Sequence, residues 1–405
     1  CRSNQLMNIL IIHQHYFPEM SGTARRAKEL AEHFVKQKHK VSILTSFPRE
    51  YRSIPGQSFD KNENLNGVTI HRVNSIFEVK NNVFLRMLSY LTFVIMSIKL
   101  GLRLSSKSDI IITIAPLSSG IIGAIIRMFN KKYHHFDIPD ILPDLGISAG
   151  MIKNKLIIFL LRKLELWVYK KCDSISTCTN GQMNNIEGKG VPRKKLSCIP
   201  DWIDTDFFNI NYKKFKGEVS TLYNYPNKII LSFVGNIGAL QKPDVFIDLM
   251  SSFKENGEND FIFLFIGDGI MLPKLRELSD RKNLDNVKFL GRVKREYIPA
   301  IMQMSDILVT NYVSDEHLNL YIPGKLFEYA ISGKPIVIGA RGDSKEFIEK
   351  YKLGLVVEPS NYLNFKDAII NISQKKYKFG PKMNEFSKDF SLKNVANRYE
   401  NIFER

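Results

Sequence analysis

The chain has 405 residues, of which 44% are hydrophobic and 24% charged, an ordinary balance for a folded globular protein. This composition excludes a largely disordered chain, and the length indicates two domains rather than one. The net charge of +17 is unevenly spread, because residues 1–200 carry 29 Lys and Arg against 14 Asp and Glu, whereas residues 201–405 carry 29 against 27. The first half is therefore expected to meet an anionic partner: a membrane surface, a nucleic acid or a phosphorylated substrate.

The four cysteines are Cys1, Cys172, Cys178 and Cys198. They show no metal-binding spacing and are too few for a disulfide framework, so a reducing cytosol is predicted. The six residues before Met7 are interpreted as an upstream remnant. The apolar run after Met7 is too short for the core of a signal peptide.

In chain order, the first predicted elements are a buried strand at 8–12, a turn-rich loop with Gly22, the helix "ARRAKELAEHFVKQ" and the strand "KVSILTSF". This order is typical of a doubly wound sheet. Gly22 lets the backbone approach a ligand, and the first amides of the following helix attract phosphate. A plain strand-to-helix turn explains the same pattern.

Two segments of the basic half combine apolar residues with Lys and Arg. Residues 84–104 hold twelve uncharged residues between Arg86 and Lys99, whereas a membrane-spanning helix needs about 20 apolar ones. Residues 151–171 hold six Lys and Arg and one acid, with Trp167 and Tyr169 among the apolar residues. Both segments fit helices that lie on an anionic bilayer. The alternative is that their apolar faces pack on the sheet and their cations are solvated.

Three polar motifs of the first 206 residues need an interpretation. The loop "HHFDIPDILPD" at 134–144 follows an apolar strand and suits the cleft side of the first domain, although capping aspartates explain it equally well. The D-x-D at 204–206 and the paired histidines at 13–15 resemble metal-binding patterns. Turn and capping chemistry explains the first, and no third ligand accompanies the second, so no metal site is predicted.

The same strand–loop–helix–strand unit restarts near residue 228, with "KIILSFVG", "NIGALQKP", "DVFIDLMSSFKE" and "FIFLFIGDG". The sequence therefore predicts an α/β protein with two Rossmann-like domains, at 1–200 and 227–383. A turn-rich linker is expected at 201–226, and the last segment, 384–405, is expected to form a helix that returns to the first domain.

Two glycines of the second half, Gly235 and Gly238, follow a predicted strand and precede a helix, which is a place for phosphates. Their spacing differs from G-x-G-x-x-G, so a nicotinamide-binding fingerprint is not supported.

The stretch "YIPGKLFEYAISGKPIVI" predicts a short helix that begins near Lys325 and ends at Gly333. Lys325 and Glu328 lie three residues apart, on one face. A lysine at a helix amino end can neutralise a diphosphate, and a glutamate one turn deeper can accept hydrogen bonds from vicinal hydroxyls. The alternative is an i,i+3 surface ion pair worth a few tenths of a kcal/mol, in which lysine before glutamate is the poorer order.

Several stretches together resemble bacterial glycosyltransferase family 4, which has the two-domain GT-B fold. In order they are "YFPEMSGTARRAKELAEHF", "HFDIPDILPD", "IPDWIDTDFF", "FVGNIGALQK", "FIGDG", "VKFLGRV", "IPGKLFEYAISGKPIV" and "GLVVEPSN". The resemblance covers nearly the whole chain from Met7 onward. Within the family it is strongest to the amino-sugar transferases of O-antigen and capsule assembly, such as the fucosamine transferases.

The resemblance implies two Rossmann-like domains facing a cleft, with a UDP-sugar donor in the second and the acceptor in the first. It implies transfer of an N-acetylhexosamine-type sugar, with retention, to a polyprenyl-diphosphate-linked glycan, without a metal or cofactor. The enzyme would lie in the cytoplasm against the anionic inner face of the membrane, and nucleic acid is not an expected partner. A nucleotide-sugar epimerase of the same fold and a non-catalytic membrane-bound subunit are the alternatives.

The site residues that the resemblance implies fall into two groups, one for the reaction and one for the donor. The expected catalytic residues are His135, Asp137, Lys325 and Glu328. The expected donor-binding residues are Gly22, Gly235, Asn236, Gln241, Lys242, Lys325, Leu326, Glu328, Arg341, Gly342, Asp343 and Ser344.

The chain departs from the family pattern at the donor site. Leu320 stands where the family often has the first of two glutamates, and Asn236 and Gln241 stand where it has the Arg and Lys of a diphosphate clamp. In the loop at 134–144, phenylalanine replaces a frequent histidine before the first aspartate. Lys325 and Lys242 are therefore the remaining candidates for the charge that binds phosphate.

Overall fold

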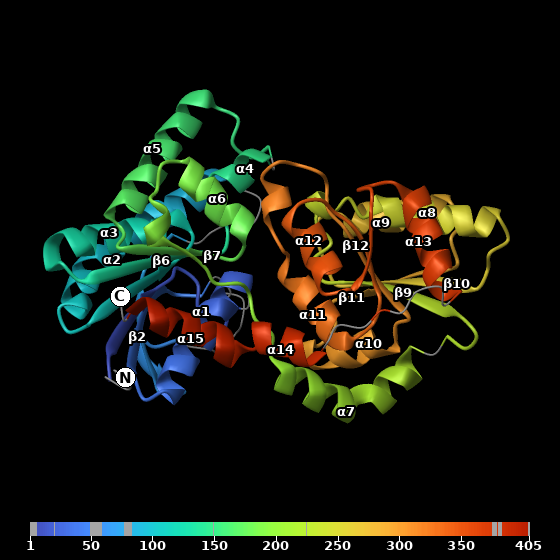
Figure 1. The fold of residues 1–405 in the computed structure, drawn as a ribbon, viewed down its shortest axis with the longest axis horizontal. Coiled ribbons are helices and arrows are strands. Elements are labelled where there is room, and N and C mark those ends of the chain that lie inside the picture. Colours follow the sequence, from blue (N-terminus) through green and yellow to red (C-terminus); the bar gives the residue numbers. More distant parts are fainter. Residues whose placement is uncertain are drawn as a thin grey trace. The chain divides into compact units, whose positions relative to one another are not determined.

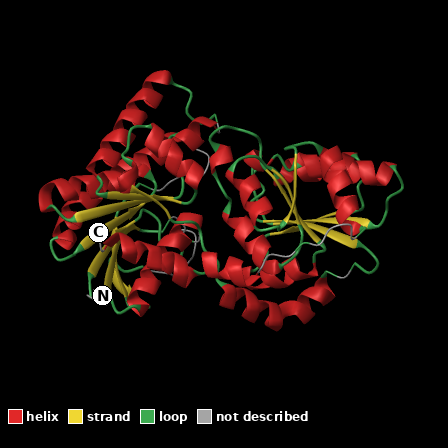
Figure 2. Ribbon diagram, in the orientation of Figure 1, coloured by secondary structure: helices red, strands yellow, loops and turns green. Residues whose placement is uncertain are grey.

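The computed structural model describes residues 6–19, 21–48, 59–76, 83–148, 150–223, 225–374, 379 and 383–403. The chain forms two compact units, Cys1–Pro200 with Val395–Arg405, and Asp201–Asn394 (Figure 1). Each unit contains one β-sheet with helices packed against it (Figure 2). The predicted α/β class with two Rossmann-like folds is thereby confirmed.

The first unit has eight strands within the described residues. They are β1 (Asn8–Ile12), β2 (Lys40–Ser46), β3 (Asn62–Leu65), β4 (Val68–Val73), β5 (Ile110–Ile114), β6 (Tyr133–Ile138), β7 (Ser174–Thr177) and β8 (Leu196–Cys198). The helices are α1 (Gly22–Lys36), α2 (Val83–Ser105), α3 (Leu117–Asn130), α4 (Asp144–Ser148), α5 (Lys155–Lys171) and α6 (Asn180–Gly188), with α15 (Leu392–Phe403) from the end of the chain.

The sheet of the first unit has the strand order β3-β4-β2-β1-β5-β6-β7-β8, and only β3 and β4 pair antiparallel. Strand β5 is buried along its whole length, as expected for a central parallel strand with helices on both faces. Helix α1 begins after Ser21, whose side chain accepts a hydrogen bond from the Ala24 amide. The loop after β1 therefore leads directly into the amino end of α1.

The second unit has six parallel strands in the order β11-β10-β9-β12-β13-β14. They are β9 (Ile229–Val234), β10 (Phe261–Ile266), β11 (Val287–Gly291), β12 (Ile307–Asn311), β13 (Ile336–Gly339) and β14 (Gly354–Val357). The helices are α7 (Thr205–Leu222), α8 (Asp244–Glu255), α9 (Leu272–Arg281), α10 (Ile298–Met304), α11 (Gly324–Ser332), α12 (Asp343–Lys350), α13 (Tyr362–Ser373) and α14 (Met383–Phe390).

Alternating residues of these strands pack into two separate apolar cores, one on each face of the sheet. Ile230 and Leu308 lie in the core on one face, whereas Leu231 and Val309 lie in the core on the other. The side-chain period of two in a strand produces this division. Because both faces are covered, the strands read as continuous apolar runs in the sequence.

The segment 201–226 is not the turn-rich linker that the sequence predicts. Most of it forms α7, capped by the Asp204 side chain, which accepts a hydrogen bond from the Phe207 amide at 2.8 Å. Phe208 and Val219 of this helix are buried in a core of the second unit. Asp204 and Thr205 are residues typical of turns, but here they begin a helix, because apolar residues follow them at helical spacing.

The segment 384–405 is divided between the two units. Helix α14 packs Phe386 and Phe390 into a core of the second unit. Residues from Val395 onward belong to the first unit, where Tyr399 of α15 is completely buried.

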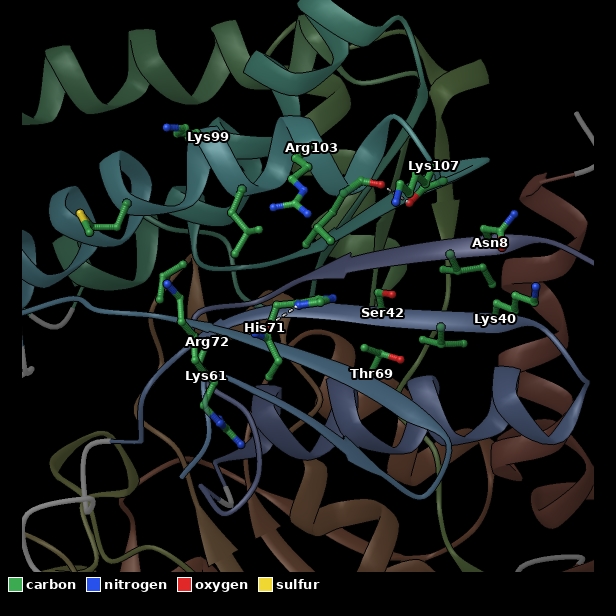
Figure 3. A pocket seen from close by; sticks show the side chains of 18 of the residues that line it. Asn8, Lys40, Ser42, Lys61, Thr69, His71, Arg72, Lys99, Arg103 and Lys107 are labelled. Carbon is green, nitrogen blue, oxygen red and sulfur yellow. Dashed lines mark hydrogen bonds between the residues drawn. The ribbon is translucent and has the colours of Figure 1, made fainter. Parts of the chain in front are cut away.

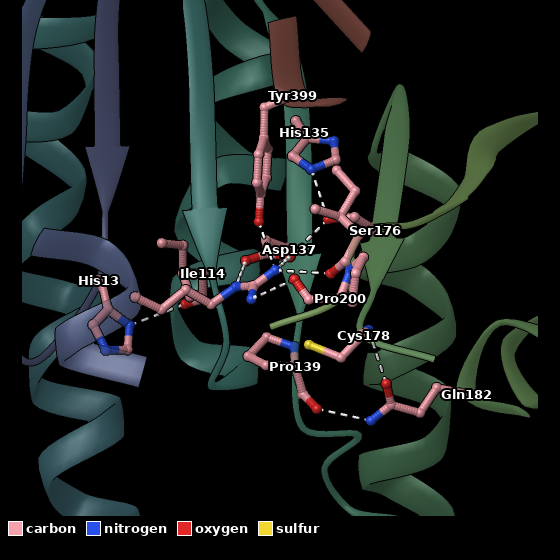
Figure 4. Close-up of polar contacts among 12 residues, drawn as sticks. His13, Ile114, His135, Asp137, Pro139, Ser176, Cys178, Gln182, Pro200 and Tyr399 are labelled. Carbon is pink, nitrogen blue, oxygen red and sulfur yellow. Dashed lines mark hydrogen bonds and ion pairs between the residues drawn. The ribbon is translucent and has the colours of Figure 1, made fainter. Parts of the chain in front are cut away.

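A buried ion pair connects three elements of the first unit. Arg26 of α1 donates to Asp137 of β6, with Nε at 2.7 Å from Oδ2 and Nη2 at 3.3 Å from Oδ1. The same guanidinium donates to the Tyr399 hydroxyl oxygen of α15 at 2.7 Å, and to the backbone oxygens of Ile199 and Pro200 (Figure 4). Asp137 is completely buried and Arg26 is 3% exposed, so the pair is shielded from water. It ties the last residues of the first unit to its centre.

Asp137→Asn is expected to destabilise the protein by roughly 3–5 kcal/mol, because the Arg26 charge would be left buried without its partner. Urea unfolding of the first unit checks this. The matched control is Glu187→Gln, which breaks an exposed ion pair with Arg193 and should change the unfolding free energy by less than about 1 kcal/mol. Equal effects of the two substitutions would contradict a structural role for the buried pair.

Candidate functional site

The carboxyl edge of the second sheet gathers the loops that the sequence singles out. All six strands are parallel, so the loops after β9, β10, β12 and β13 leave the sheet at one edge. The strand order reverses direction beside β9, which is where open α/β sheets bind their ligands. Gly235 and Gly267 follow β9 and β10 with φ angles of 125° and 132°, values that favour glycine. The Gly235 amide donates to the Ile266 oxygen at 2.8 Å, so the two loops are joined.

Lys325 lies in the first turn of α11 and points to the glycine turn after β9. Its Nζ is 4.0 Å from the centre of the Phe233 ring, and a Cβ added to Gly235 would lie 3.4 Å from Nζ. This Nζ is buried and has no hydrogen-bond partner among the described residues. Burial lowers the pKa of Lys325 to about 7, although Glu328 opposes the shift. The site therefore holds a cation whose charge the folded chain leaves largely uncompensated.

The amino end of α11 adds to the positive potential at this position. The residue before the helix is Pro323, which supplies no side-chain cap, and the first turn contains no acidic residue. Free amides at a helix amino end favour an anion, and the lysine charge acts in the same direction. The helix ends at Gly333, with a φ angle of 69°, as its sequence predicts.

Glu328 does not pair with Lys325, although the two lie one turn apart. Its Oε1 is 3.2 Å from Nη2 of Arg295, which follows β11, and the two side chains are 29% and 41% exposed. Arg295 also stacks on Phe207, with its guanidinium carbon 5.0 Å from the ring centre. Sequence reasoning missed Arg295, and its only signal was a basic stretch after a predicted strand, at the carboxyl edge.

The residues that replace the family's diphosphate clamp have other partners. The Gln241 side-chain oxygen accepts a hydrogen bond from the Gly238 amide at 3.0 Å, and the Gln241 backbone oxygen accepts one from Asn311 at 2.9 Å. Gln241 therefore holds the shape of its own loop. Asn236 and Lys242 are exposed in that loop, and their role in donor binding stays a prediction.

The loop before α12 packs against the loop that leads into α11. A Cβ at Gly342 would lie 2.0 Å from the Asn319 backbone oxygen, and the φ angle of Gly342 is 59°. Ser344 donates to the Tyr321 backbone oxygen at 2.6 Å. Between them, Asp343 is the first residue of α12. Gly342 and Ser344 therefore support the approach to α11, whatever else they contact.

Two other expected donor-binding residues have different surroundings. Arg341 is exposed and forms an ion pair with Glu358 at 2.5 Å. The Leu326 side chain is completely buried in the apolar core, so only its backbone is available to a donor, and its role in donor binding stays a prediction.

Gly22, His135 and Asp137 belong to the first unit, and all other predicted site residues belong to the second. Gly22 is exposed at the start of α1, with nothing within 4 Å of an added Cβ. His135 is completely buried, and its two ring nitrogens lie 2.8 and 2.9 Å from the hydroxyls of Ser174 and Ser176 (Figure 4).

A catalytic role for His135 and Asp137 is contradicted by their surroundings. Burial lowers the pKa of His135 to about 4, and its ring packs edge-on against Tyr399. Burial alone would raise the pKa of Asp137, but the charge and hydrogen bonds of Arg26 outweigh it and the pKa is lowered. Both Asp137 oxygens are engaged, by Arg26 and by the Ser176 hydroxyl. These two side chains hold β6 in place rather than reach a ligand.

The two metal-like patterns also have structural roles. Asp204 caps α7, and His13 is completely buried, with Nδ1 3.2 Å from the Ile114 oxygen. Within the described ranges, no group of three or more His, Cys, Asp and Glu is placed to hold a metal ion.

An apolar pocket opens at the carboxyl edge of the first sheet. Its volume is about 360 Å³, and it lies between α2, the starts of α3 and α4, and α5. Pro116 and Leu117 follow β5 and line it, as do Leu142 and Pro143 after β6. This is the edge at which open α/β sheets bind ligands, and the pocket is suited to a hydrocarbon.

Large apolar side chains are exposed on α2 and on the first turns of α5. On α2 they include Phe84 (72%) and Leu91 (55%), and on α5 they include Leu156 (65%) and Phe159 (52%). By length and composition, the helix Phe84–Ser105 could cross a membrane, although the uncharged run between Arg86 and Lys99 predicts a segment too short to span a bilayer. Several of its residues, such as Phe93, are nevertheless buried in a core of the first unit.

Lys325→Met is expected to stabilise the protein near pH 7, because it removes an unpaired cation from a buried position. The folded-state pKa of about 7 lies below the unfolded value of 10.5, so the unfolded state binds more protons between these values. The unfolding free energy of the unsubstituted protein should therefore rise from pH 7.5 to 9.5, by up to about 1 kcal/mol per pH unit. Lys325→Met should lack this rise. Identical pH profiles of urea unfolding would show that Lys325 is solvated.

Comparison with known proteins gives these two units a family. Residues 20–207 match the family described as Glycosyltransferase Family 4, and residues 221–390 match Glycosyl transferases group 1. WcaI of Escherichia coli K12, named as a glycosyl transferase of colanic acid biosynthesis, is 24% identical over 318 residues, which cover 74% of this chain and 75% of WcaI. The D-rhamnosyltransferase WbpZ of Pseudomonas aeruginosa is 23% identical over 226 residues, or 55% of each chain.

Solved structures show the same fold over nearly the whole chain. HepE of Anabaena, in complex with UDP, matches with a TM-score of 0.73 and 13% identity, over 98% of this chain and 100% of HepE. Sucrose-phosphate synthase of Thermosynechococcus elongatus matches with a TM-score of 0.77 and 15% identity, over 98% of each chain. With both of its units matched in sequence and in fold, the chain belongs to the glycosyltransferases of the GT-B fold, with a family 4 amino-terminal and a group 1 carboxyl-terminal domain.

Proposed function

We propose that this glycosyltransferase takes a sugar from a UDP-linked donor bound by the second unit and transfers it to a polyprenyl-diphosphate-linked glycan bound by the first. The observation that carries the proposal is the Lys325 Nζ, buried beside the Gly235 turn and lacking a hydrogen-bond partner in the described chain. A diphosphate supplies the missing negative charge. The HepE structure contains UDP on a similar fold, which supports a uridine nucleotide.

The leaving group of this reaction is a nucleoside diphosphate, so negative charge develops on its phosphates in the transition state. Lys325 and the first amides of α11 stabilise this charge in a partly dry position, where electrostatic interactions are stronger than in water. The proposed transfer needs no metal, because one fixed cation and preorganised amides neutralise the phosphates. The family resemblance supports retention at the anomeric carbon.

Glu328 is proposed to accept hydrogen bonds from the vicinal hydroxyls of the donor ribose. Its carboxylate is 29% exposed and is held by Arg295 at 3.2 Å. An ion pair of this kind fixes the carboxylate in position, and a partly exposed carboxylate can accept hydrogen bonds from hydroxyls. Arg295 is therefore a positioning residue in this proposal.

An N-acetylhexosamine-type sugar is proposed as the group transferred. The chain has Asn236 and Gln241 at the clamp positions and Leu320 in place of the first glutamate. The amino-sugar branch that the chain resembles shares several of these departures. The names of WcaI and WbpZ support a place in the biosynthesis of a surface polysaccharide.

The acceptor's lipid is proposed to bind the first unit at the cytoplasmic face of the membrane. The apolar pocket at the carboxyl edge holds hydrocarbon, and the exposed apolar residues of α2 and α5 contact the bilayer beside it. Lys153, Lys155 and Arg162 accompany them at the start of α5, where they favour anionic lipids.

Lys325→Met and Glu328→Gln are each expected to weaken UDP binding about tenfold or more, because each removes a hydrogen bond to a charged group. Calorimetric titration with UDP measures this, and Glu277→Gln is the matched control, since that carboxylate also pairs with an arginine, Arg281. Unchanged UDP affinity in both variants would contradict the donor site. Incubation with a panel of UDP-sugars and no acceptor then separates transfer from epimerisation, because only an epimerase converts the donor alone.

Phe84→Ser combined with Phe159→Ser is expected to reduce flotation with phosphatidylglycerol vesicles severalfold, because burying each ring in the bilayer contributes about 1.5–3 kcal/mol. Ile210→Ser combined with Leu222→Ser is the control, because these residues are 62% and 57% exposed on α7 of the second unit. Equal flotation of the two double variants would contradict the membrane contact.

A further inference from the structure

We propose that a basic groove on the first unit binds an acidic oligosaccharide, one that carries carboxylate or phosphate groups. The groove has a volume of about 1040 Å³ and lies between the second half of α2 and one face of strands β1, β2 and β4 (Figure 3). The inference rests on the proposed function, because it assigns an acidic character to the glycan that this enzyme handles. It adds a binding site on the first unit that, among the described residues, shares no lining residue with the apolar pocket.

The floor of the groove is a sheet face that changes character along its strands. In the carboxyl halves, Leu44 of β2 and Val73 of β4 pack into the apolar core beneath α2. Toward the amino ends, Ser42 of β2 is paired in register with Thr69 of β4, and His71, two residues later in β4, is paired with Leu44. Ser42, Thr69 and His71 line the groove and are only partly buried, and Val73 also borders it. The polar part of the floor therefore lies toward the amino ends of the strands.

Five cations line the groove, and they come from both of its walls. Lys99, Arg103 and Lys107 come from α2 and the turn after it, and Lys40 and Lys61 come from the sheet side. Figure 3 shows Arg103 pointing from α2 toward His71. All five are exposed, and within the described part of the chain none of them forms an ion pair.

Acidic residues do not balance these charges. No Asp or Glu is among the residues that line the groove in the described structure. The sixth cation, Arg72, is already paired with Glu63. Outside the groove, the Asp109 carboxylate accepts hydrogen bonds from the backbone and side chain of Asn8. The groove therefore keeps a positive potential that a bound anion would lower.

Helix stability accounts for only part of this arrangement. Arg103 lies in the last turn of α2, where a cation is favoured, but Lys99 lies four residues before it, and like charges at that spacing destabilise a helix. The positive charges of Lys40 and Lys61 on the opposite wall add further repulsion. Burial of His71, and the charge of Arg103, lower the pKa of this histidine, in keeping with a positive environment. Such a cluster is stabilised when an anionic ligand occupies it.

The shape of the groove favours an extended oligosaccharide over a membrane surface. Hydroxyl, amide and imidazole groups line the groove between its apolar residues and can hydrogen-bond to sugars, whereas a flat bilayer would reach only the cations at the rim. On α2, Phe84 and Leu91 lie about 60–80° round the helix from Lys99 and about 100–120° from Arg103. Bilayer contact and the groove therefore use adjacent sides of α2.

The groove is also long enough for several sugars. It extends from Lys40 at the amino end of β2 to Phe47 just after its carboxyl end. Seven residues of β-strand span about 20 Å. The carboxyl end of the groove is at the edge where open α/β sheets bind their ligands, so a glycan could extend from that edge along the strands.

The test compares two triple variants that each remove three positive charges. The groove variant is Lys99→Ala, Arg103→Ala and Lys107→Ala, and its control is Lys213→Ala, Lys214→Ala and Lys216→Ala on α7, where all three lysines are exposed. The probes are oligogalacturonate, neutral dextran oligosaccharides of the same length and phosphatidylglycerol vesicles. Affinity is measured by calorimetry at two salt concentrations, because interactions of exposed charges weaken as salt increases.

We expect the unsubstituted protein and the control to bind oligogalacturonate and the groove variant to bind it about tenfold more weakly or worse. None of the three proteins should bind the neutral dextran oligosaccharides. If the groove variant keeps its oligogalacturonate affinity within twofold, the proposal is overturned. It is equally overturned if the groove variant loses vesicle binding while its oligogalacturonate affinity is unchanged, since the cations would then serve the membrane.

A floor variant, Thr69→Tyr, separates shape from charge. It fills the polar floor without changing the net charge, and a strand accepts an aromatic residue. We expect it to weaken oligogalacturonate binding and to leave vesicle flotation unchanged. These measurements do not involve the donor. If the unsubstituted protein binds UDP but no oligogalacturonate, the groove proposal is refuted and the donor-site proposal is unaffected. The effect of Lys325→Met on UDP binding tests the donor site alone.

Discussion

The Lys325 ammonium is the charge around which the second unit's site is arranged. It lies over the Phe233 ring, beside a glycine turn that leaves room for it, at the amino end of a helix that adds potential of the same sign. A buried cation without a partner is costly, and its lowered pKa expresses that cost. The glycines after β9 and β10 and the packing of Gly342 on Asn319 keep the surrounding loops in place. An anionic ligand would complete the site.

The first unit also contains buried charges, but these charges neutralise each other. Asp137 and Arg26 compensate each other, and the remaining hydrogen bonds of Arg26 go to Tyr399 and to backbone oxygens. A compensated pair of this kind stabilises a fold and has no need of a ligand. Charge compensation within the fold therefore distinguishes Asp137, which has a structural role, from Lys325, which we propose binds the donor, although both are charged residues of the motifs that carry the resemblance.

Helix α2 serves several surfaces of the first unit at once. One side packs Phe93 into the core, another exposes Phe84 and Leu91, and a third contributes Lys99 and Arg103 to the basic groove. The apolar pocket also borders this helix. Part of the excess positive charge of the first half of the chain is thus gathered in the basic groove.

The sequence by itself determined the opening strand, helix and strand of each unit, the short helix at Lys325 and the restart near residue 228, because these depend on the spacing of apolar residues a few positions apart. It also located the glycine turns and Lys325. Tertiary structure decided which residues meet: Gly235 and Lys325 are 90 positions apart and are brought together by the strand order, and Arg295 reaches Glu328 from another loop. It also decided that His135 is buried and that 201–226 is largely a helix of the second core. Such outcomes depend on packing between distant segments, which local spacing does not encode.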